Sequence, residues 1–281
     1  MRRILTLESV GDDVFRGESN IAAPRIYGGQ ALGQSLAAAG LTVDSDRQAH
    51  SLHGHFIHPG RSDIPVEYHV ERLRDGGSFT TRHVRAVQGD RTIFVATASF
   101  QRPETGLEHQ QPMSEPAIPP EQLPQFEDSM STLELGEAGW LLPLLSNIGV
   151  EFRFPEEYPR LANRRGEVRP PRQRAWVRTP EPLGDDALTQ AAGFAYCSDL
   201  FLLSAALPPH GRHIDSPGLQ LASLDHTVWF HTPFRADEWH LYEQEGSWMG
   251  SGRGLSRGHL FDREGNLVAS TAQEGLLRFR A

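Results

Sequence analysis

The sequence contains no lysine and only one cysteine. All 27 basic residues are therefore arginine, which excludes Schiff-base chemistry by a lysine and leaves guanidinium groups as the cations available to a phosphate. A lone Cys197 can form neither an intrachain disulfide nor a thiolate metal site. We expect its side chain to be buried and inert.

Long apolar runs and an excess of positive charge are also absent. No stretch approaches the roughly 20 apolar residues that a helix needs to cross a bilayer, and the apolar run at the N-terminus is too short for a signal peptide. The net charge of −9 disfavours nucleic acid as a partner. We expect an ordinary globular protein in the cytoplasm, with no membrane span.

The most informative feature that is present is an internal repeat. His58 and His231 each follow a bulky apolar pair, and the offset between them is 173 residues. The same offset aligns 95–98 with 268–271, where apolar, small and hydroxyl residues recur in the same order. A repeat of this length indicates two copies of one small domain, fused head to tail.

Each copy shows the pattern of one helix followed by antiparallel strands, which is typical of the α+β class. We predict an N-terminal domain over 1–110, a Pro-rich linker over 111–138 and a C-terminal domain over 139–281, in which 140–154 rejoins a core. The first domain is predicted to contain a helix over 28–40 and strands over 51–57, 64–73, 79–87 and 93–100. The second is predicted to contain a helix over 187–207 and strands over 221–230, 239–245, 252–261 and 267–277.

Two motifs imitate catalytic signatures. The segment 53–58, His-Gly-His-Phe-Ile-His, nearly matches the zinc motif HxHxDH, but Ile57 occupies the acidic position. With the offset of 173, His53 aligns with His226 and His58 aligns with His231. Repetition therefore explains the pattern better, and we expect no metal site. Ser35 lies in a sequence like the nucleophile elbow GxSxG, but inside a predicted helix rather than at a strand-to-helix turn, which indicates a packing role.

The two halves differ at polar positions. With the offset of 173, Ser223 falls on His50 and Gln273 falls on Phe100, so the second half carries chemistry that the first half lacks. Asp199, whose alignment in the helix is looser, falls near Ile26 and lies among apolar residues. A carboxylate there caps a helix turn or acts chemically, and the residues alone favour the cap.

Several segments, taken together, resemble the acyl-CoA thioesterase II family over nearly the whole chain except the linker. In the first half these are Phe15-Arg16-Gly17, Tyr27-Gly28-Gly29-Gln30, His50-Ser51-Leu52-His53, Leu73-Arg74-Asp75-Gly76 and Ala98-Ser99-Phe100-Gln101. In the second half they are Ala195-Tyr196-Cys197-Ser198-Asp199, Leu224 to His231 and Ser270-Thr271-Ala272-Gln273-Glu274-Gly275. The resemblance implies a double hotdog, two repeats each made of a long helix wrapped by a curved antiparallel sheet.

The resemblance also implies hydrolysis of fatty acyl-CoA to a free fatty acid and CoA. The family's catalytic aspartate, threonine or serine, and glutamine match Asp199, Ser223 and Gln273. Ser223 stands where relatives often have threonine and keeps the hydroxyl. His58 stands where relatives often have arginine, which leaves its role open.

Substrate, assembly and mechanism follow as further expectations. We expect acyl-CoA to contact Gly28, Gly29, Arg74, Gly76, Ser78 and Arg253, the last within a Gly-rich stretch where it could meet a phosphate. No cofactor is implied, and the association of relatives through their sheets implies a homodimer or homotetramer. Asp199 is expected to accept a proton from water, with its pKa raised by apolar surroundings and with backbone N–H groups near Gly28-Gly29 or at the second helix holding the oxyanion.

Two other functions stay open from the residues. A hotdog hydratase would carry the motif DxNxxH, whereas Leu200-Phe201 follow Asp199 and the nearest downstream histidine is His210. A non-catalytic acyl-CoA-binding protein would share the fold and lose the three polar residues, all of which are present here.

Overall fold

The computed structural model describes residues 1–19, 24–126, 128 and 147–280. Its helices are α1 (Arg2–Leu5), α2 (Gly28–Gly40), α5 (Pro159–Arg164) and α6 (Ala187–Ser198), with 3-10 turns η1 (Pro120–Gln122), η2 (Leu203–Ala206) and η3 (Pro208–His210). Its strands in the first half are β1 (Glu8–Gly11), β2 (Val14–Gly17), β3 (Gln48–Phe56), β4 (Val66–Asp75), β5 (Phe79–Gln88) and β6 (Arg91–Gln101). Those in the second half are β7 (Glu151–Arg153), β8 (Arg172–Arg178), β9 (Leu219–Ser223), β10 (Asp225–Phe230), β11 (His240–Gly250), β12 (Arg253–Phe261) and β13 (Leu267–Phe279).

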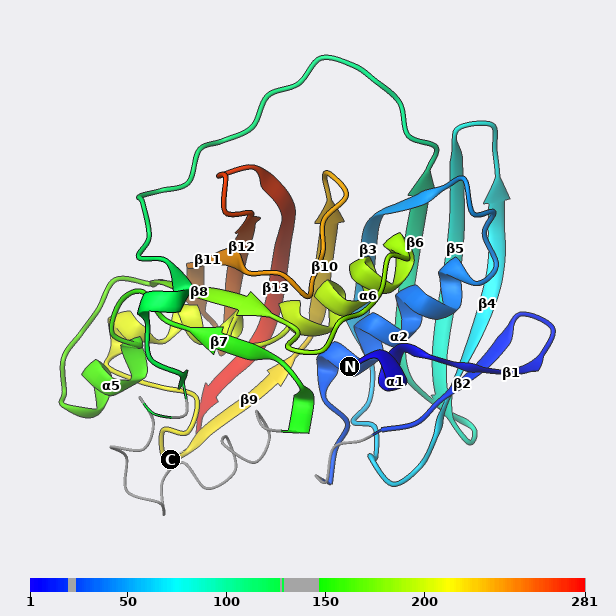
Figure 1. Ribbon diagram of the computed structural model, residues 1–281. Helices are drawn as coiled ribbons and strands as arrows, with labels where there is room; N and C mark the ends of the chain where they lie inside the picture. The colour runs from blue at the N-terminus through cyan, green and yellow to red at the C-terminus, as the bar shows by residue number, and fades with distance from the viewer. Residues whose placement is uncertain (20–23, 127, 129–146, 281) are drawn as a thin grey trace.

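One antiparallel sheet runs through both halves. Its order is β1-β2-β4-β5-β6-β3-β10-β13-β12-β11-β8-β7, with β9 also paired to β13. The halves meet where β3 pairs with β10, and His53 lies opposite Thr227 in that pair. The helices α2 and α6 lie side by side against the same face of the sheet (Figure 1). This arrangement confirms the predicted α+β class and the predicted order of one helix followed by a meander in each half.

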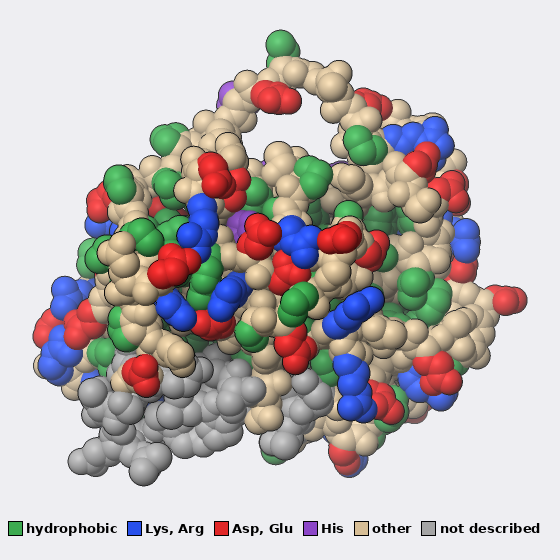
Figure 2. Space-filling model, viewed as in Figure 1, with side chains coloured by type: hydrophobic (Ala, Val, Ile, Leu, Met, Phe, Trp, Pro, Cys, Tyr) green, Lys and Arg blue, Asp and Glu red, His purple; other side chains and the backbone are tan. Residues whose placement is uncertain are grey.

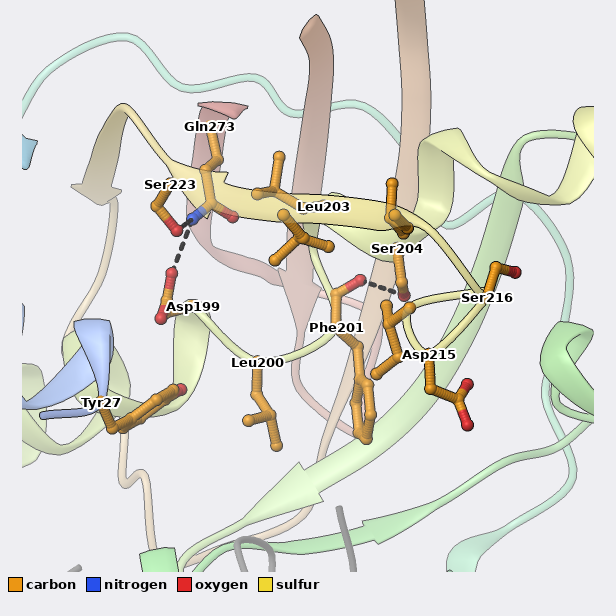
Figure 3. Close-up of a pocket in the computed structure, with 13 residues that line it drawn as sticks. Tyr27, Asp199, Leu200, Phe201, Leu203, Ser204, Asp215, Ser216, Ser223 and Gln273 are labelled. Atoms are coloured by element: carbon orange, nitrogen blue, oxygen red, sulfur yellow. Dashed lines mark hydrogen bonds between the residues drawn. The ribbon is translucent and has the colours of Figure 1, made fainter. Parts of the chain in front are cut away.

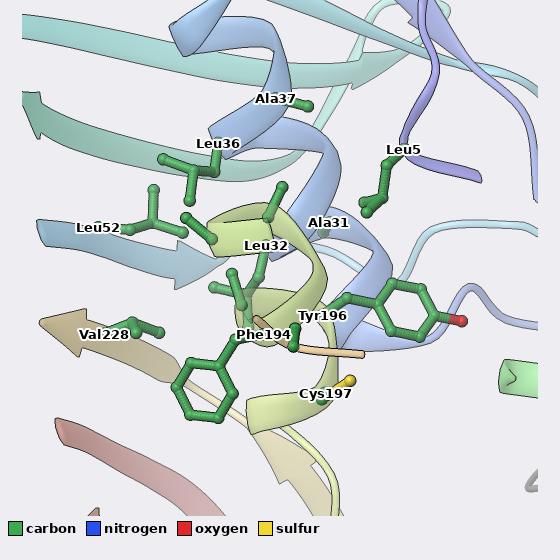
Figure 4. Packing of buried hydrophobic residues seen from close by; sticks show 14 of the residues in the cluster. Leu5, Ala31, Leu32, Leu36, Ala37, Leu52, Phe194, Tyr196, Cys197 and Val228 are labelled. Carbon is green, nitrogen blue, oxygen red and sulfur yellow. The ribbon is translucent and has the colours of Figure 1, made fainter. Parts of the chain in front are cut away.

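Glycines let α2 and α6 approach closely, and the two helices run in opposite directions. A Cβ added to Gly33 would lie 2.9 Å from the carbonyl oxygen of Ala192, and one added to Gly40 would lie 2.3 Å from Leu188. Leucines of α2 and Phe194 of α6 then pack against Leu52 and Val228 of the central strands (Figure 4). The two halves therefore share one core.

The ends of two predicted elements were wrong. The helix predicted over 187–207 ends at Ser198, and the following residues turn back through η2 and η3. The strand predicted over 221–230 is interrupted at Leu224, whose backbone bonds to Phe56 on one side and Glu274 on the other. Both interruptions fall beside the site described below, and no glycine or proline marks either break in the sequence.

The predicted repeat register, an offset of 173 residues, was also wrong, by one residue in the first strands and by two residues from 93 onward. The backbone N–H groups of Ile57 and His58 donate to the carbonyl of Ile93 at 2.9 and 3.2 Å, and that of His231 donates to the carbonyl of Val268 at 2.9 Å. The alternation of buried residues, Leu52 and Gly54 against His226 and Val228, matches Ile57 rather than His58 with His231. In the same way Arg102 donates to Ser78 and Leu277 donates to Gly252. The offset is therefore 174 residues up to the turn at 78 and 175 residues from 93 onward.

A slip of one residue in a strand moves every side chain to the other face of the sheet. His53 is exposed whereas His226 is fully buried, so these two histidines are not counterparts. With the offset of 174, His226 matches the buried Leu52, and His53 matches Thr227, with which it is paired.

The remaining predictions concern the linker, the cysteine and the membrane. The described part of 111–138 is mostly exposed but packs Met113, Ala117 and Leu123 against a small second core, while 140–146 lies outside the described residues. Cys197 is buried, as predicted, and burial raises the pKa of its thiol well above the ordinary value. One stretch of the described chain, Ala187–His210, is apolar and long enough to cross a bilayer, but its most apolar window is 94% buried within the core.

Charges of both signs are interspersed on the face shown in Figure 2. Many arginines of the described residues form ion pairs with carboxylates, such as Arg165 with Glu157 and Arg169 with Glu167. A face of this kind offers no broad cationic surface of the type that binds nucleic acid.

Candidate active site

The break after α6 places a carboxyl group between the two halves. Asp199 is the C-terminal cap of α6, and its side chain reaches the N-terminus of α2 from the other repeat. The backbone N–H of Gly29 hydrogen-bonds to this carboxyl group. A Cβ on Gly28 would lie 2.7 Å from the Asp199 Oδ2, so only glycine leaves room for the carboxyl group there. The prediction that Asp199 caps a helix was right in kind, but the helix is that of the opposite half.

Two further side chains meet this carboxyl group (Figure 3). Gln273, on β13, donates from Nε2 to Asp199 Oδ1 at 2.6 Å and to the hydroxyl oxygen of Ser223 at 2.9 Å. Ser223 ends β9, directly before the interruption at Leu224. The three polar residues selected from the sequence therefore form one connected group, assembled from a helix end and two strands that are far apart in the chain.

Burial sets the protonation of the group. Desolvation raises the pKa of Asp199 to about 6 from its ordinary value of 3.8, against hydrogen bonds from Gln273, Gly29 and Ser223 that favour the carboxylate. At neutral pH the carboxylate is thus ionised but is a stronger base than an exposed aspartate. Such a group, within hydrogen-bond reach of a bound water, can accept its proton.

A cavity of about 560 Å³ opens beside the three residues. Its walls are mainly apolar, and its polar groups lie at the Asp199 end and around Asp215. The lining residues are Tyr27, Asp199, Leu200, Phe201, Leu203, Ser204, Ile214, Asp215, Ser216, Leu219, Leu221, Ser223 and Gln273. An apolar cavity with polar groups gathered at one place suits a ligand that has an apolar chain and a reactive polar group.

The corrected repeat register sharpens the difference between the halves. The counterpart of Ser223 is Ala49, and that of Gln273 is Ala98, rather than His50 and Phe100. Asp199 caps the end of α6, and the residue that caps α2 is Leu41, so the predicted match to Ile26 was also wrong. The first half thus has apolar side chains at each corresponding position.

The other predicted substrate contacts fall into two places. Gly28 and Gly29 adjoin Asp199, and the N–H of Gly29 is already used by the carboxyl group. Arg74, Gly76 and Ser78 lie at the β4–β5 turn, where Arg47 donates to the carbonyl of Gly76 at 2.8 Å. None of these three lines the cavity, and their contact with substrate stays a prediction.

Arg253 begins β12 after the turn at Ser251 and Gly252, which is the counterpart of the turn at Ser78. Its guanidinium lies 3.3 Å from the carboxylate of Glu274 and over the ring of Trp248. This ion pair is half-exposed, so the guanidinium could exchange it for a phosphate. That role also stays a prediction.

The two motifs that imitate catalytic signatures, the segment 53–58 and the sequence around Ser35, have structural explanations in the fold. His53 and His55 lie on the exposed face of β3, and His58 bonds through Nδ1 to the carbonyl of Thr92 at 2.8 Å. Among the described residues no group of three or more His, Cys, Asp or Glu side chains could hold a metal ion. Ser35 is fully buried within α2, as its predicted packing role requires.

Sequence reasoning missed two side chains near the group. His226 is fully buried, and its Nδ1 lies 3.9 Å from Asp199 Oδ1. Tyr27 lines the cavity and donates to the carbonyl of Tyr196 at 3.0 Å. The signal for His226 was present in the repeat, because its counterpart is a leucine, but the register error paired it with His53.

Comparison with known proteins places the chain in a family. Residues 149–276 match the family described as acyl-CoA thioesterase, and residues 16–101 match the acyl-CoA thioesterase N-terminal domain. Acyl-CoA thioesterase 2 of Haemophilus influenzae is 37% identical over 98% of this chain and 96% of its own length. The chain belongs to the acyl-CoA thioesterase II family. Human acyl-coenzyme A thioesterase 8 is also 37% identical, over 99% of this chain and 88% of its own length.

Solved structures agree with this family membership. An acyl-CoA thioesterase II from Mycobacterium marinum matches with a TM-score of 0.80 and 38% identity, covering 100% of this chain and 98% of its own. A protein with a hot dog fold from Alicyclobacillus acidocaldarius also gives a TM-score of 0.80, at 18% identity over 99% and 98% of the two chains, and supports the fold alone. The fold of this member of the thioesterase II family is the double hotdog predicted from its sequence.

Proposed function

We propose that this protein hydrolyses fatty acyl-CoA to a free fatty acid and CoA, with Asp199 as the base that activates water. The observation that carries the proposal is the hydrogen-bonded group of Asp199, Ser223 and Gln273 at the polar end of an apolar cavity. Membership of the acyl-CoA thioesterase II family supports the substrate class.

The geometry suggests how the three side chains share the work. Gln273 donates to both partners, so the Ser223 oxygen accepts from Gln273 while the Ser223 hydroxyl proton is directed toward the Asp199 carboxylate. A water held between Ser223 and Asp199 loses a proton to the carboxylate as its oxygen attacks the thioester carbon. The tetrahedral intermediate then expels the CoA thiolate, which receives a proton and needs little acid assistance because thiols have a pKa near 8.5.

The acyl chain would lie along the apolar wall of the cavity. Leu200 and Phe201 follow Asp199 directly, and Leu203, Leu219 and Leu221 extend the wall. This continuity lets an acyl group extend away from the reacting carbon without leaving apolar surroundings.

Release of free thiol tests the proposal. The protein is incubated with a series of straight-chain acyl-CoA substrates, and the thiol is followed with a chromogenic disulfide. Turnover of at least one chain length well above the rate without protein is expected. Saturable binding of every acyl-CoA with no thiol release would instead favour a non-catalytic acyl-CoA-binding protein.

The pKa of Asp199 predicts the pH dependence. The base acts only when ionised, and its pKa is about 6, so kcat/KM should rise with pH through an apparent pKa near 6 and then level off. With an exposed aspartate as the base, kcat/KM would instead rise through an apparent pKa near 4. A kcat/KM profile between pH 4.5 and 8, measured with substrate that is stable over that range, distinguishes the two. A profile that is flat down to pH 5 would contradict the assignment of Asp199.

We also propose that the protein forms a homodimer or homotetramer in the cytoplasm. The outer face of the central strands carries Trp229 against His53, with ring centroids 5.3 Å apart, and Trp229 is partly exposed there. A large aromatic side chain at the middle of an open sheet face is suited to burial in a subunit interface. Sedimentation velocity at micromolar concentration would measure the assembly, and a purely monomeric species would contradict it.

A further inference from the structure

His226 and Gln273 are neighbours across two strands. The pairing of β10 with β13 sets Thr227 opposite Ala272, and the next residues in this register are His226 and Gln273. Both side chains are buried, at 0% and 1% exposure. Directly opposed residues of an antiparallel pair have Cβ atoms about 4.5–5.5 Å apart, so these side chains meet inside the fold.

Two buried polar atoms at this contact lack partners within the part of the chain that the structure describes. They are the Nδ1 of His226 and the Oε1 of Gln273. The other ring nitrogen of His226 lies 2.8 Å from the hydroxyl oxygen of Ser198. Interaction with Gln273 favours the charged form of the ring, as expected when a ring nitrogen faces the amide oxygen.

We infer that His226 is a positioning residue for the reaction: its neutral ring carries the proton on Nδ1 and donates it to Gln273 Oε1. This bond fixes the amide with its NH₂ group toward Asp199 and Ser223. The Ser198 hydroxyl then donates to Nε2. The inference rests on the proposed function, because the group that it orients is the one proposed to activate water.

The alternative arrangements cost more. With the proton on Nε2, the lone pair of Nδ1 would face both the amide oxygen of Gln273 and the Asp199 carboxylate, which is 3.9 Å away. With the amide of Gln273 flipped, its oxygen would face that carboxylate at the position now occupied by the donor at 2.6 Å. Each arrangement sets buried acceptors against one another, whereas a proton on Nδ1 sets a donor toward the unpartnered amide oxygen of Gln273.

His226 acts through Gln273 and does not itself react. It does not line the cavity, and burial lowers the pKa of its ring to about 3, so the ring is neutral over the working pH range. In the first repeat its counterpart is Leu52, beside the alanine that matches Gln273. The histidine therefore occurs in the repeat that has the polar group and is replaced by leucine in the repeat that lacks it.

Isosteric variants test the inference. The amide nitrogen of asparagine can take the place of Nδ1, and that of glutamine the place of Nε2. We expect His226→Asn to keep kcat within about threefold, and both His226→Gln and His226→Leu to lower it about 10- to 100-fold with little change in KM. His226→Leu installs the residue that the first repeat tolerates at this position. Equal losses in all three variants, or full activity of His226→Leu, would overturn the inference.

The pH profile separates positioning from general damage. Without the fixed amide, Asp199 loses a donor, so the acid limb of kcat/KM in His226→Leu should move to higher pH. Ser256 supplies a matched control and the competing donor, because it lies opposite Gln273 on the other neighbouring strand, is equally buried, and its Oγ also lacks a partner among the described residues. Ser256→Ala should leave the limb in place. If the acid limb moved in Ser256→Ala and not in His226→Leu, Ser256 rather than His226 would orient Gln273, and the inference would be wrong.

The tautomer can be measured without any turnover. Long-range ¹H–¹⁵N correlation of ¹⁵N-histidine-labelled wild-type protein distinguishes a proton on Nδ1 from one on Nε2, and His226→Asn identifies the resonance. A proton on Nδ1 is expected, and one on Nε2 would overturn the inference. If the wild-type protein released no thiol, the proposed function would fail, and this measurement would still decide how Gln273 is oriented.

Discussion

Asp199→Asn should lower kcat by about 10²- to 10⁴-fold while the protein remains folded and still binds acyl-CoA. The amide has the size of the carboxyl group and can still accept the hydrogen bond from Gln273, but it cannot take a proton from water. Thiol release under saturating substrate measures kcat, and titration with a non-hydrolysable thioether analogue of acyl-CoA measures binding. Asp185→Asn is a matched control, since Asp185 lies on the surface with its side chain 97% exposed.

The same substitution has a predictable effect on stability. The pKa of Asp199 is about 6 in the folded protein and near 3.8 when exposed, so the unfolded chain releases this proton at lower pH than the folded protein does. Stability therefore falls as pH rises from about 4 to 6, and the cost above pH 6 is about 3 kcal/mol at 1.36 kcal/mol per pH unit. Asp199→Asn should raise the free energy of unfolding at pH 8 by up to that amount.

Urea unfolding at pH 8 and at pH 4 tests this sign, because the advantage of the asparagine should shrink at the lower pH. A variant that is less stable than wild type at pH 8 would show that the hydrogen bonds of the carboxylate outweigh its desolvation. Retention of near-normal kcat would remove Asp199 from the proposed mechanism whatever its stability.

Among glycine-to-alanine substitutions at the interface of α2 and α6, Gly29→Ala should lower the free energy of unfolding the most. Its Cβ would lie 2.1 Å from the backbone carbonyl oxygen of Tyr196 and 2.4 Å from the ring of Tyr27. A backbone atom cannot move aside as a flexible side chain can, so α2 and α6 would have to separate. We expect a loss of at least about 3 kcal/mol, measured by urea unfolding, and loss of the N–H bond to Asp199.

Gly77→Ala is the control for this effect. A Cβ at Gly77 would meet no atom within 4 Å, so its stability should stay within about 1 kcal/mol of wild type. If Gly29→Ala were as stable as Gly77→Ala, the helices would not be held as closely as the structure indicates.

Both repeats contribute to the candidate site, but they contribute different groups. The second repeat supplies Asp199, Ser223 and Gln273, and the first supplies the helix N-terminus that holds the carboxyl group. The reciprocal position has Leu41, Ala49 and Ala98. The two-fold pseudosymmetry thus gives two equivalent positions for a site, and the polar side chains occur at only one of these two positions.

Sequence reasoning went furthest where chemistry and pattern agreed. The helix over 28–40 was predicted with its observed bounds, because its small and apolar residues follow a helical period and end at Gly40. It failed at Ser198 and at Leu224, where the chain breaks without a glycine or proline to mark the end of the element. The four strands β1, β2, β7 and β8 were not predicted at all, since they are short or, in the case of Arg172–Arg178, rich in arginine.

The amino-acid sequence by itself determined that the chain is duplicated, that its halves differ at three polar positions, and which family those motifs resemble. It did so because residue types and their order are properties of the chain alone. Only the tertiary structure decided the register of the repeat, the cap that Asp199 provides to the opposite helix, and the contact between His226 and Gln273. Each of these depends on which side of a strand a residue faces and on which distant segment lies opposite. A slip of one residue moves every side chain of a strand to the other face of the sheet, yet it leaves the sequence resemblance unchanged.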